Sequence, residues 1–317
     1  GDVVEPRREF IEDNALKVAN LEVSGQGAHR IDAPLSHRSL QRRETPARIP
    51  PMSRTRLLAT AVLAAALVAA CATTTSPTGR TQYVGAVSQA QLDQLGAKAF
   101  AEQKASKPQA SDAAQRRYVA CVTDSIVAGL PAQWRAYRWE SAVFVDDEPN
   151  AFALPGGKVG VYTGIFRVAR DQDQLAAVIA HEVGHVVARH HDERITRQVG
   201  AAGAVNLLGA LAGDYGQVAA QGGSILAQAG FLLPNSRAQE SEADVVGQRL
   251  MAEAGYDPRG AVVLWRNMAE VGGTRPPRWL STHPDPASRL RELDARAASL
   301  LPVMEQARRA GRTPRCR

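Results

Sequence analysis

Apolar residues recur three and four positions apart over several stretches of the chain, which is the spacing of one face of a helix. Runs of small, β-branched and aromatic residues between turn residues are typical of strands. A Pro-Gly-Gly turn at Pro155 separates the last two of these runs. The pattern predicts helices over 89–106, 111–129, 171–191, 236–254, 258–271 and 286–310, and strands over 139–145, 150–154 and 158–162. We therefore expect an α+β fold, mainly helical, with a small antiparallel sheet.

The clearest helix is predicted from Asp171 to His191. Asp171 is a capping residue, and Gln174 follows three positions later, as in a capping box. Leu175 and Val178 begin its apolar stripe. Beyond this helix, residues 198–231 are rich in Ala and Gly and are expected to form two small helices around Gly213-Asp214-Tyr215-Gly216.

The long helix contains His181-Glu182-Val183-Gly184-His185, an H-E-x-x-H motif. Residues four apart lie on the same helical face, with their side-chain roots about 5–6 Å apart. His181 and His185 can therefore converge on one zinc ion, one per chain. Glu182 lies beside them and is expected to act as the general base of a hydrolase. The alternative is a surface helix with two unrelated histidines.

A catalytic zinc needs a third protein ligand, and two sources are available. His191 follows the motif, but Ala188 stands where the longer metzincin pattern has glycine. In a continuous helix, His191 would lie about 9 Å beyond His185 at 1.5 Å per residue. The other source is Glu240, on a second helix. Asp244 lies four residues later on the same face, where it can hydrogen-bond a zinc-bound histidine, whereas Glu242 is expected to point elsewhere.

These residues resemble the HtpX-like gluzincin peptidases, which include the CAAX prenyl endopeptidase and periplasmic lipoprotein proteases. The similarity extends to Asn150-Ala151-Phe152, to Glu240-x-x-Ala243-Asp244 and to Ser281-Thr282-His283-Pro284. It implies a zincin-type metalloprotease domain in which the sheet lies beside the active-site helix. It also implies Glu240 as a zinc ligand.

The same resemblance places His283 at the active site. Three roles stay open for this residue: a donor to the oxyanion, a zinc ligand that closes the resting site, or a structural cap. We expect Val159, Gly160 and Val161 to lie on an edge strand that binds substrate backbone by strand addition. The expected substrates are unfolded or misassembled envelope proteins, in protein quality control. A chaperone or assembly scaffold with a latent zinc site is the alternative.

Residues 52–70 have the parts of an export signal. A basic stretch after Met52 leads into an apolar run from Leu57 to Ala70, shorter than the roughly 20 residues needed to span a bilayer. Val68-Ala69-Ala70-Cys71 resembles a bacterial lipobox, whose cysteine is lipidated; the alternative is a short core helix. Because Ala72 follows, the resemblance implies an outer-membrane lipoprotein that faces the periplasm and has a lipid anchor on Cys71.

The rest of the chain is divided into one folded domain and flexible stretches around it. Residues 1–51 are either a misassigned start or a disordered arm, and 71–88 form the lipidated cysteine and a polar linker. The protease domain is expected over 89–310, followed by a basic tail at 311–317. The net charge of +6 is concentrated at the two ends of the chain, which we interpret as solvated tails, with no nucleic-acid partner.

The chain has three cysteines and no C-x-x-C spacing. If Cys71 is lipidated, Cys121 and Cys316 remain in an oxidising compartment, where thiols tend to pair. We predict a disulfide between Cys121 and Cys316, and the alternative is two free thiols.

Overall fold

The computed structural model describes residues 73–211, 235–271, 282–283 and 288–317, and for 201–211 it describes the backbone alone. The export signal, Cys71, Gly213-Asp214-Tyr215-Gly216, Ser281 and Pro284 lie outside the described residues. None of the described helices is long and apolar enough to cross a bilayer.

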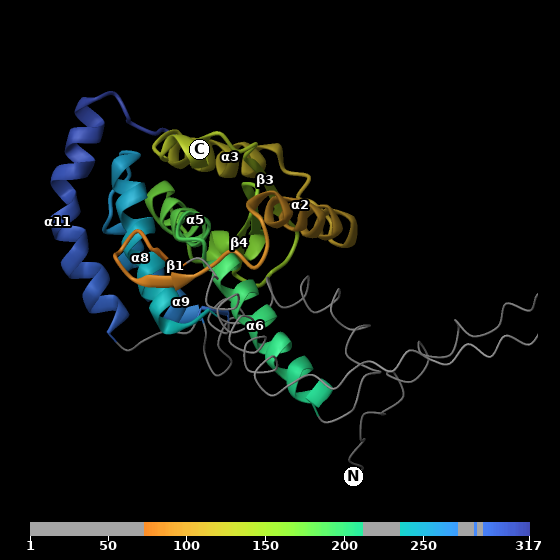
Figure 1. Ribbon diagram of the computed structural model, residues 1–317. Coiled ribbons are helices and arrows are strands. Elements are labelled where there is room, and N and C mark those ends of the chain that lie inside the picture. The colour runs from red at the N-terminus through yellow and green to blue at the C-terminus, as the bar shows by residue number, and fades with distance from the viewer. Residues whose placement is uncertain (1–72, 212–234, 272–281, 284–287) are drawn as a thin grey trace, which may run out of the picture. The chain divides into compact units, whose positions relative to one another are not determined.

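The described part is mainly helical, with two small sheets (Figure 1). The predicted α+β class is confirmed. The strands are β1 (Thr73–Thr75), β2 (Thr81–Tyr83), β3 (Glu140–Phe144), β4 (Ala151–Leu154) and β5 (Lys158–Tyr162). The helices are α2 (Gln89–Ser106), α3 (Ala113–Ala128), α4 (Ala132–Arg135), the 3₁₀ helix η1 (Thr163–Arg167), α5 (Gln172–Val187), α6 (His190–Leu211), α8 (Arg237–Glu253), α9 (Gly260–Val271) and α11 (Arg289–Arg309).

The larger sheet has the order β3-β5-β4 and is mixed, not antiparallel as predicted. The strands β4 and β5 form the expected hairpin, whereas β3 pairs with the other side of β5 and runs parallel to it. As a result β5 is central and β4 is an outer strand of this sheet.

Helix α5 is the centre of the fold. It packs against α8, α9, α3 and strand β4, and α8 lies between α5 and α11 (Figure 1). Apolar side chains along the helix are fully buried, including Leu175, Val178 and Ile179. Burial of one such side chain typically contributes about 1.5–3 kcal/mol, so this helix is held firmly in the core.

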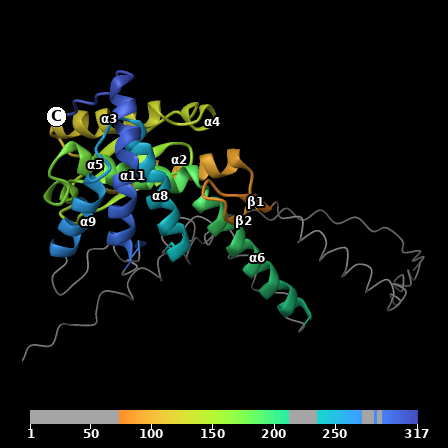
Figure 2. The same cartoon turned by 90° about the vertical axis from the view of Figure 1, so that its left-hand side faces the viewer.

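Both ends of α5 are set by local interactions. At its start, the Asp171 carboxylate accepts the backbone N–H of Gln174, as predicted from the capping pattern. The helix ends at Val187, four residues before the predicted end at His191. Arg189 then has a φ of 57°, a left-handed conformation that is uncommon for a bulky residue. This turn starts α6, which contacts α5 and β2 at its beginning and leads away from α5 (Figure 2).

The predicted flexible linker is not what the structure shows for Thr73 to Tyr83. The strands β1 and β2 pair as an antiparallel hairpin, with Thr73 opposite Tyr83. Side chains of this hairpin contact the helical body; Gln82 is buried and donates to the carbonyl of Ala188 at 2.7 Å. The folded part therefore includes residues well before the expected start at Gln89.

Candidate metal centre

Helix α5 brings His181 and His185 together, as the H-E-x-x-H spacing predicts. Both rings are buried, and their Nε2 atoms lie 3.1 Å apart. The Nδ1 atoms point away from this meeting point toward other partners. The two Nε2 atoms are therefore the ones available to a metal ion.

Helix α8 adds Glu240 to the same place. Its Oε2 lies 3.4 Å from Nε2 of His181, and its Oε1 lies 3.4 Å from Nε2 of His185. Glycines allow the two helices to approach this closely. A Cβ on Gly247 would lie 2.7 Å from the Cα of His181, and a Cβ on Gly184 would lie 3.0 Å from the carbonyl oxygen of Ala243.

His283 completes the group from a distant segment of the chain. Its Nδ1 lies 3.0 Å from Oε1 of Glu240 and 3.3 Å from Nε2 of His181. One ligand atom from each of His181, His185, Glu240 and His283 lies within 4.8 Å of the others, and all four residues are buried. In the described residues this is the group of His, Cys, Asp and Glu side chains that fits a metal ion.

The spacing of these atoms fits zinc. Two ligands that are each about 2.0–2.1 Å from a tetrahedral zinc lie about 3.3 Å apart. The separations of 3.1 and 3.4 Å between the His181, His185 and Glu240 atoms are close to that value. Nitrogen and carboxylate oxygen are also common zinc donors.

Glu182 lies beside this group without belonging to it. Its side chain is buried, and its Oε1 is 3.4 Å from Nε2 of His283. It is one residue round the helix from His181, so its carboxylate reaches the same space from a different angle. This is the position that a general base needs if it is to act on water next to the metal ligands.

His181 is supported by a buried ion pair. Its Nδ1 lies 2.9 Å from Oδ1 of Asp244, the contact expected from the sequence. Arg289, at the start of α11, binds the same carboxylate with a 2.6 Å contact and reaches Oε2 of Glu240 at 3.2 Å. Its guanidinium stacks on Trp265, 3.6 Å from the ring centroid. Sequence reasoning missed Arg289, because a single arginine near a helix start has no distinctive pattern.

His185 is supported by different residues. Its Nδ1 lies 2.7 Å from Nδ1 of His190, and Nε2 of His190 lies 3.1 Å from Oε2 of Glu242. Glu242 is buried and forms an ion pair with Arg80 at 2.9 Å. Glu242 therefore points away from the metal group, as expected, and its contact with His190 supports a ligand of that group.

His191 does not join the metal group. It is buried next to His190, but it lies outside the set of residues that converge at His181 and His185. The predicted helix end at His191 was wrong, because α5 ends at Val187 and the chain turns at Arg189. The turn brings His190 toward His185 instead.

Electrostatics keep the two histidines different. Burial lowers the pKa of His185 well below its usual range, so this ring is neutral, as a metal ligand must be. Burial also lowers the pKa of His181, but hydrogen bonds to Asp244 and Glu240 outweigh it and raise that pKa to about 9. A proton therefore competes with a metal ion at His181.

The expected substrate strand needs a correction. Val159, Gly160 and Val161 lie on β5, which is paired on both sides, so its backbone groups are already used. The hydrogen bond from Tyr162 N–H to the carbonyl of Asn150 sets the register of β4 against β5. Alternation then turns the backbone groups of Ala151 and Ala153 away from β5.

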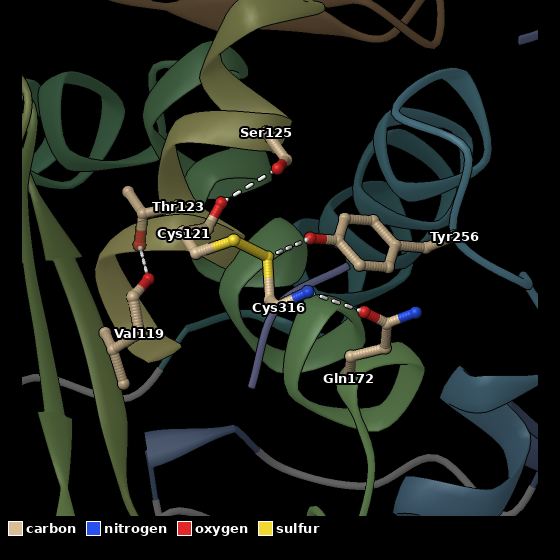
Figure 3. The surroundings of a disulfide bond; sticks show 7 residues. All are labelled: Val119, Cys121, Thr123, Ser125, Gln172, Tyr256 and Cys316. Atoms are coloured by element: carbon tan, nitrogen blue, oxygen red, sulfur yellow. Dashed lines mark hydrogen bonds between the residues drawn. A yellow bond between two sulfur atoms is a disulfide. The ribbon is translucent and has the colours of Figure 1, made fainter. Parts of the chain in front are cut away.

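Cys121 and Cys316 form a disulfide in the structure, as the sequence analysis predicts (Figure 3). It joins α3 to the C-terminal tail across a sequence separation of 195. The backbone N–H of Cys316 donates to Oε1 of Gln172 at 3.1 Å, at the start of α5, and the hydroxyl of Tyr256 lies 3.4 Å from its sulfur. The last residues are therefore part of the fold, not the separate basic tail that was expected over 311–317.

Comparison with known proteins identifies the domain. The model of Peptidase family M48 matches residues 113–297, more than half of the chain. The chain belongs to peptidase family M48. The predicted family is thus confirmed, and with it the class of enzyme, a zinc metalloendopeptidase. M48 peptidases use zinc, and the group of histidines and glutamate on α5 and α8 lies inside the matched region.

The relatives of this M48 domain include a mitochondrial protease and a bacterial one. Over 161 residues, 50% of this chain and 46% of the relative, it is 42% identical to the mitochondrial metalloendopeptidase OMA1 of Schizosaccharomyces pombe. Over 171 residues, 51% of this chain and 35% of the relative, it is 33% identical to the beta-barrel assembly-enhancing protease of Escherichia coli K12. The chain spans less than half the length of these two relatives.

Proposed function

We propose that this chain is a zinc-dependent endopeptidase that cleaves unfolded or misassembled proteins of the bacterial envelope. His181, His185 and Glu240 are the proposed zinc ligands and Glu182 the general base. The observation that carries the proposal is the convergence of three ligand atoms at tetrahedral spacing, with the Glu182 carboxylate beside them.

Each residue then has a defined task. Zinc, when bound, supplies a Lewis acid that polarises a peptide carbonyl and lowers the pKa of water. Glu182 accepts the proton of the attacking water and delivers it to the leaving amine. Asp244 holds the proton on Nδ1 of His181, which leaves Nε2 free to bind the metal.

His283 is the proposed gate of this site. Its short contacts with Glu240 and His181 support a resting state in which it occupies a fourth ligand position. A catalytic zinc needs that position open for substrate. Displacement of His283 would open it. Donation to the oxyanion is the second role predicted for this residue, and under that role replacement of His283 would lower activity. A structural cap is the third role and would leave activity unchanged when His283 is replaced.

Substrate is proposed to add to the sheet at β4. This strand is the outer one next to α5, and the backbone groups of Ala151 and Ala153 turn outward. Recognition through backbone hydrogen bonds is tolerant of side-chain sequence, which suits a protease for unfolded chains.

The envelope location is also a proposal. Its supports are the lipobox-like Val68-Ala69-Ala70-Cys71 and the similarity to the beta-barrel assembly-enhancing protease. We propose an outer-membrane lipoprotein with a lipid on Cys71. Membrane fractionation checks it: the wild type should sediment with outer membranes and Cys71→Ala should not, and equal distribution of both would contradict the anchor.

The test of the catalytic proposal compares Glu182→Gln with Glu270→Gln, an exposed glutamate on α9. We expect Glu182→Gln to keep zinc and to cleave casein at least about 100-fold more slowly, the lower range for loss of a general base. Glu270→Gln should behave as the wild type. Undiminished cleavage by Glu182→Gln contradicts the mechanism.

The alternative is a chaperone or assembly scaffold with a latent zinc site, and the contacts of His283 are the observation that favours it. His283→Ala separates the two proposals. A gated protease gains activity in this variant, and Glu182→Gln in the same background abolishes the gain. A scaffold gains none.

A further inference from the structure

The hairpin from Thr73 to Tyr83 is fastened to the helices that carry the metal group. The guanidinium of Arg80 forms a two-point ion pair with Glu193 of α6, at 2.7 and 2.8 Å. The same guanidinium donates to Oε2 of Glu242 on α8, at 2.9 and 3.1 Å. The hydroxyl of Thr78 donates to the other oxygen of Glu242 at 2.7 Å. One buried carboxylate is thus held from both sides by the hairpin.

From Glu242 a chain of contacts leads to the metal group. Oε2 of Glu242 is 3.1 Å from Nε2 of His190, and Nδ1 of His190 is 2.7 Å from Nδ1 of His185. His190 is completely buried. The hairpin also fixes the turn before His190, because Gln82 donates to the carbonyl of Ala188. No part of this chain of contacts involves Asp244 or Arg289, which support the other histidine.

A single placement of protons satisfies these contacts. If Nε2 of His185 is to bind zinc, its proton must be on Nδ1, which then donates to Nδ1 of His190. The proton of His190 must therefore be on Nε2, where it donates to Glu242. The carboxylate accepts it and accepts from Arg80 and Thr78 as well. Each member of the chain fixes the tautomer of the next.

We propose that Arg80, Glu242 and His190 are positioning residues for His185, so that docking of the hairpin from Thr73 to Tyr83 sets how tightly the chain binds zinc. The inference rests on the proposed role of His185 as a ligand. Partners that hydrogen-bond a metal-bound histidine orient its ring and raise its basicity. Here the outermost partner, Arg80, comes from the hairpin, which precedes the region matched by the family model, so metal affinity responds to the docking of that hairpin.

Two substitutions of His190 test the relay. In His190→Asn the amide oxygen stands where Nδ1 stood and can still accept from His185, whereas His190→Leu has similar size and no acceptor. Zinc affinity is measured by competition with a chromophoric chelator, and the visible spectrum of the Co²⁺-loaded protein reports the ligand geometry. We expect His190→Leu to bind zinc about 10- to 100-fold more weakly, with a changed Co²⁺ spectrum, and His190→Asn to recover most of the affinity.

A second pair of variants tests the role of the hairpin. It compares Arg80 with Arg197, which shares one ion-pair partner with it. Arg80 and Arg197 both form an ion pair with Glu193, but only Arg80 also reaches Glu242. We expect Arg80→Met to weaken zinc binding and to alter the Co²⁺ spectrum, and Arg197→Met to leave both unchanged. This pair decides the question if His190→Leu fails to fold.

The outcomes separate the inference from the function on which it rests. If the wild type binds no zinc, the proposed metal centre itself is wrong. If it binds zinc and His190→Leu matches it, or His190→Asn loses as much as His190→Leu, the relay is wrong. Equal effects of Arg80→Met and Arg197→Met would overturn the role of the hairpin.

Discussion

The two histidines of the H-E-x-x-H motif occupy equivalent positions on one helix, yet their surroundings differ. His181 is supported from the core, by Asp244 and by Arg289, which is 1% exposed. His185 is supported by His190 and Glu242, and this series of contacts ends at Arg80, whose side chain is 25% exposed. The residues that support His181 (the core arm) are therefore buried in the interior, whereas those that support His185 (the surface arm) extend to the surface through a hairpin.

Helix α8 explains how both arms can exist. Glu240 and Asp244 are four residues apart and lie on one face of this helix, whereas Glu242, two residues from each, projects from another side. Glu240 enters the metal group, Asp244 supports His181 and Glu242 supports His185 through His190. An acidic helix face that resembles a solvated surface is in fact buried on several sides. This contrast predicts that substitutions in the two arms change the free energy of unfolding by different amounts.

The largest expected effect is on the core arm. Arg289→Met removes the buried cation that faces Asp244 and Glu240. Breaking a buried ion pair by removing one partner typically costs about 3–5 kcal/mol, because the carboxylates stay behind without compensation. Urea unfolding of the metal-free protein should show a loss of this size. A change below that caused by Arg80→Met would contradict the distinction between core and surface arms.

A smaller loss of stability should leave both arms intact. Replacement of Cys121 and Cys316 by serine removes the disulfide. It lies next to Gln172, the first residue of α5, at the opposite end of the helix from the metal ligands. Disulfides typically contribute about 2–4 kcal/mol. We expect unfolding at lower urea with unchanged zinc affinity. Weaker zinc binding in this variant would show that global stability, and not the local arms, controls the site. Mass spectrometry of a non-reduced digest should find the two cysteine peptides linked.

The smallest expected effect is the pH dependence of the surface arm. Burial raises the pKa of Glu193, but hydrogen bonds from Arg80 and Gln239 lower it by more, so the net pKa is below the ordinary 4.5. The pKa of Glu242 is lowered in the same way, with His190 and the hairpin outweighing burial. A lowered folded-state pKa means that the stabilisation is complete above about pH 4.5 and is lost as the pH falls further.

The difference in unfolding free energy between the wild type and Arg80→Met reports this loss. At neutral pH we expect about 1–3 kcal/mol, the range for hydrogen bonds to charged groups and for buried groups that lose them. The difference should stay constant down to about pH 4.5 and shrink below it. A difference that grows as the pH falls would contradict the assignment of Glu193 and Glu242 as ionised partners.

Local patterns predicted much of this fold. The strands at β3, β4 and β5 and the helices α2, α3, α5 and α8 lie close to their predicted ranges, because alternation and capping act over a few residues. Ser236 caps α8 with Gln239 in a complete capping box, and Gly255 follows it with a φ of 93°. The H-E-x-x-H spacing also predicted that His181 and His185 meet, and the family resemblance implied Glu240 as their partner.

Contacts between distant segments could not be predicted in the same way. The early end of α5 depends on a left-handed Arg189, which a propensity argument disfavours for such a residue. The strand order depends on where β3 pairs, and adjacency in sequence does not determine that. The hairpin at Thr73 is polar in composition and resembles a linker, but Arg80 finds its partners more than a hundred residues away.

The disulfide between Cys121 and Cys316 has a consequence for a cut chain. The loop that it closes contains His181, His185, Glu240 and His283. A single peptide-bond cleavage between α6 and α8 would separate the two histidines of α5 from Glu240 in sequence, but the two pieces would stay covalently joined. Such a nicked molecule would differ from the intact chain only by the water added at the cut, and the cut would show as two fragments only on a reducing gel.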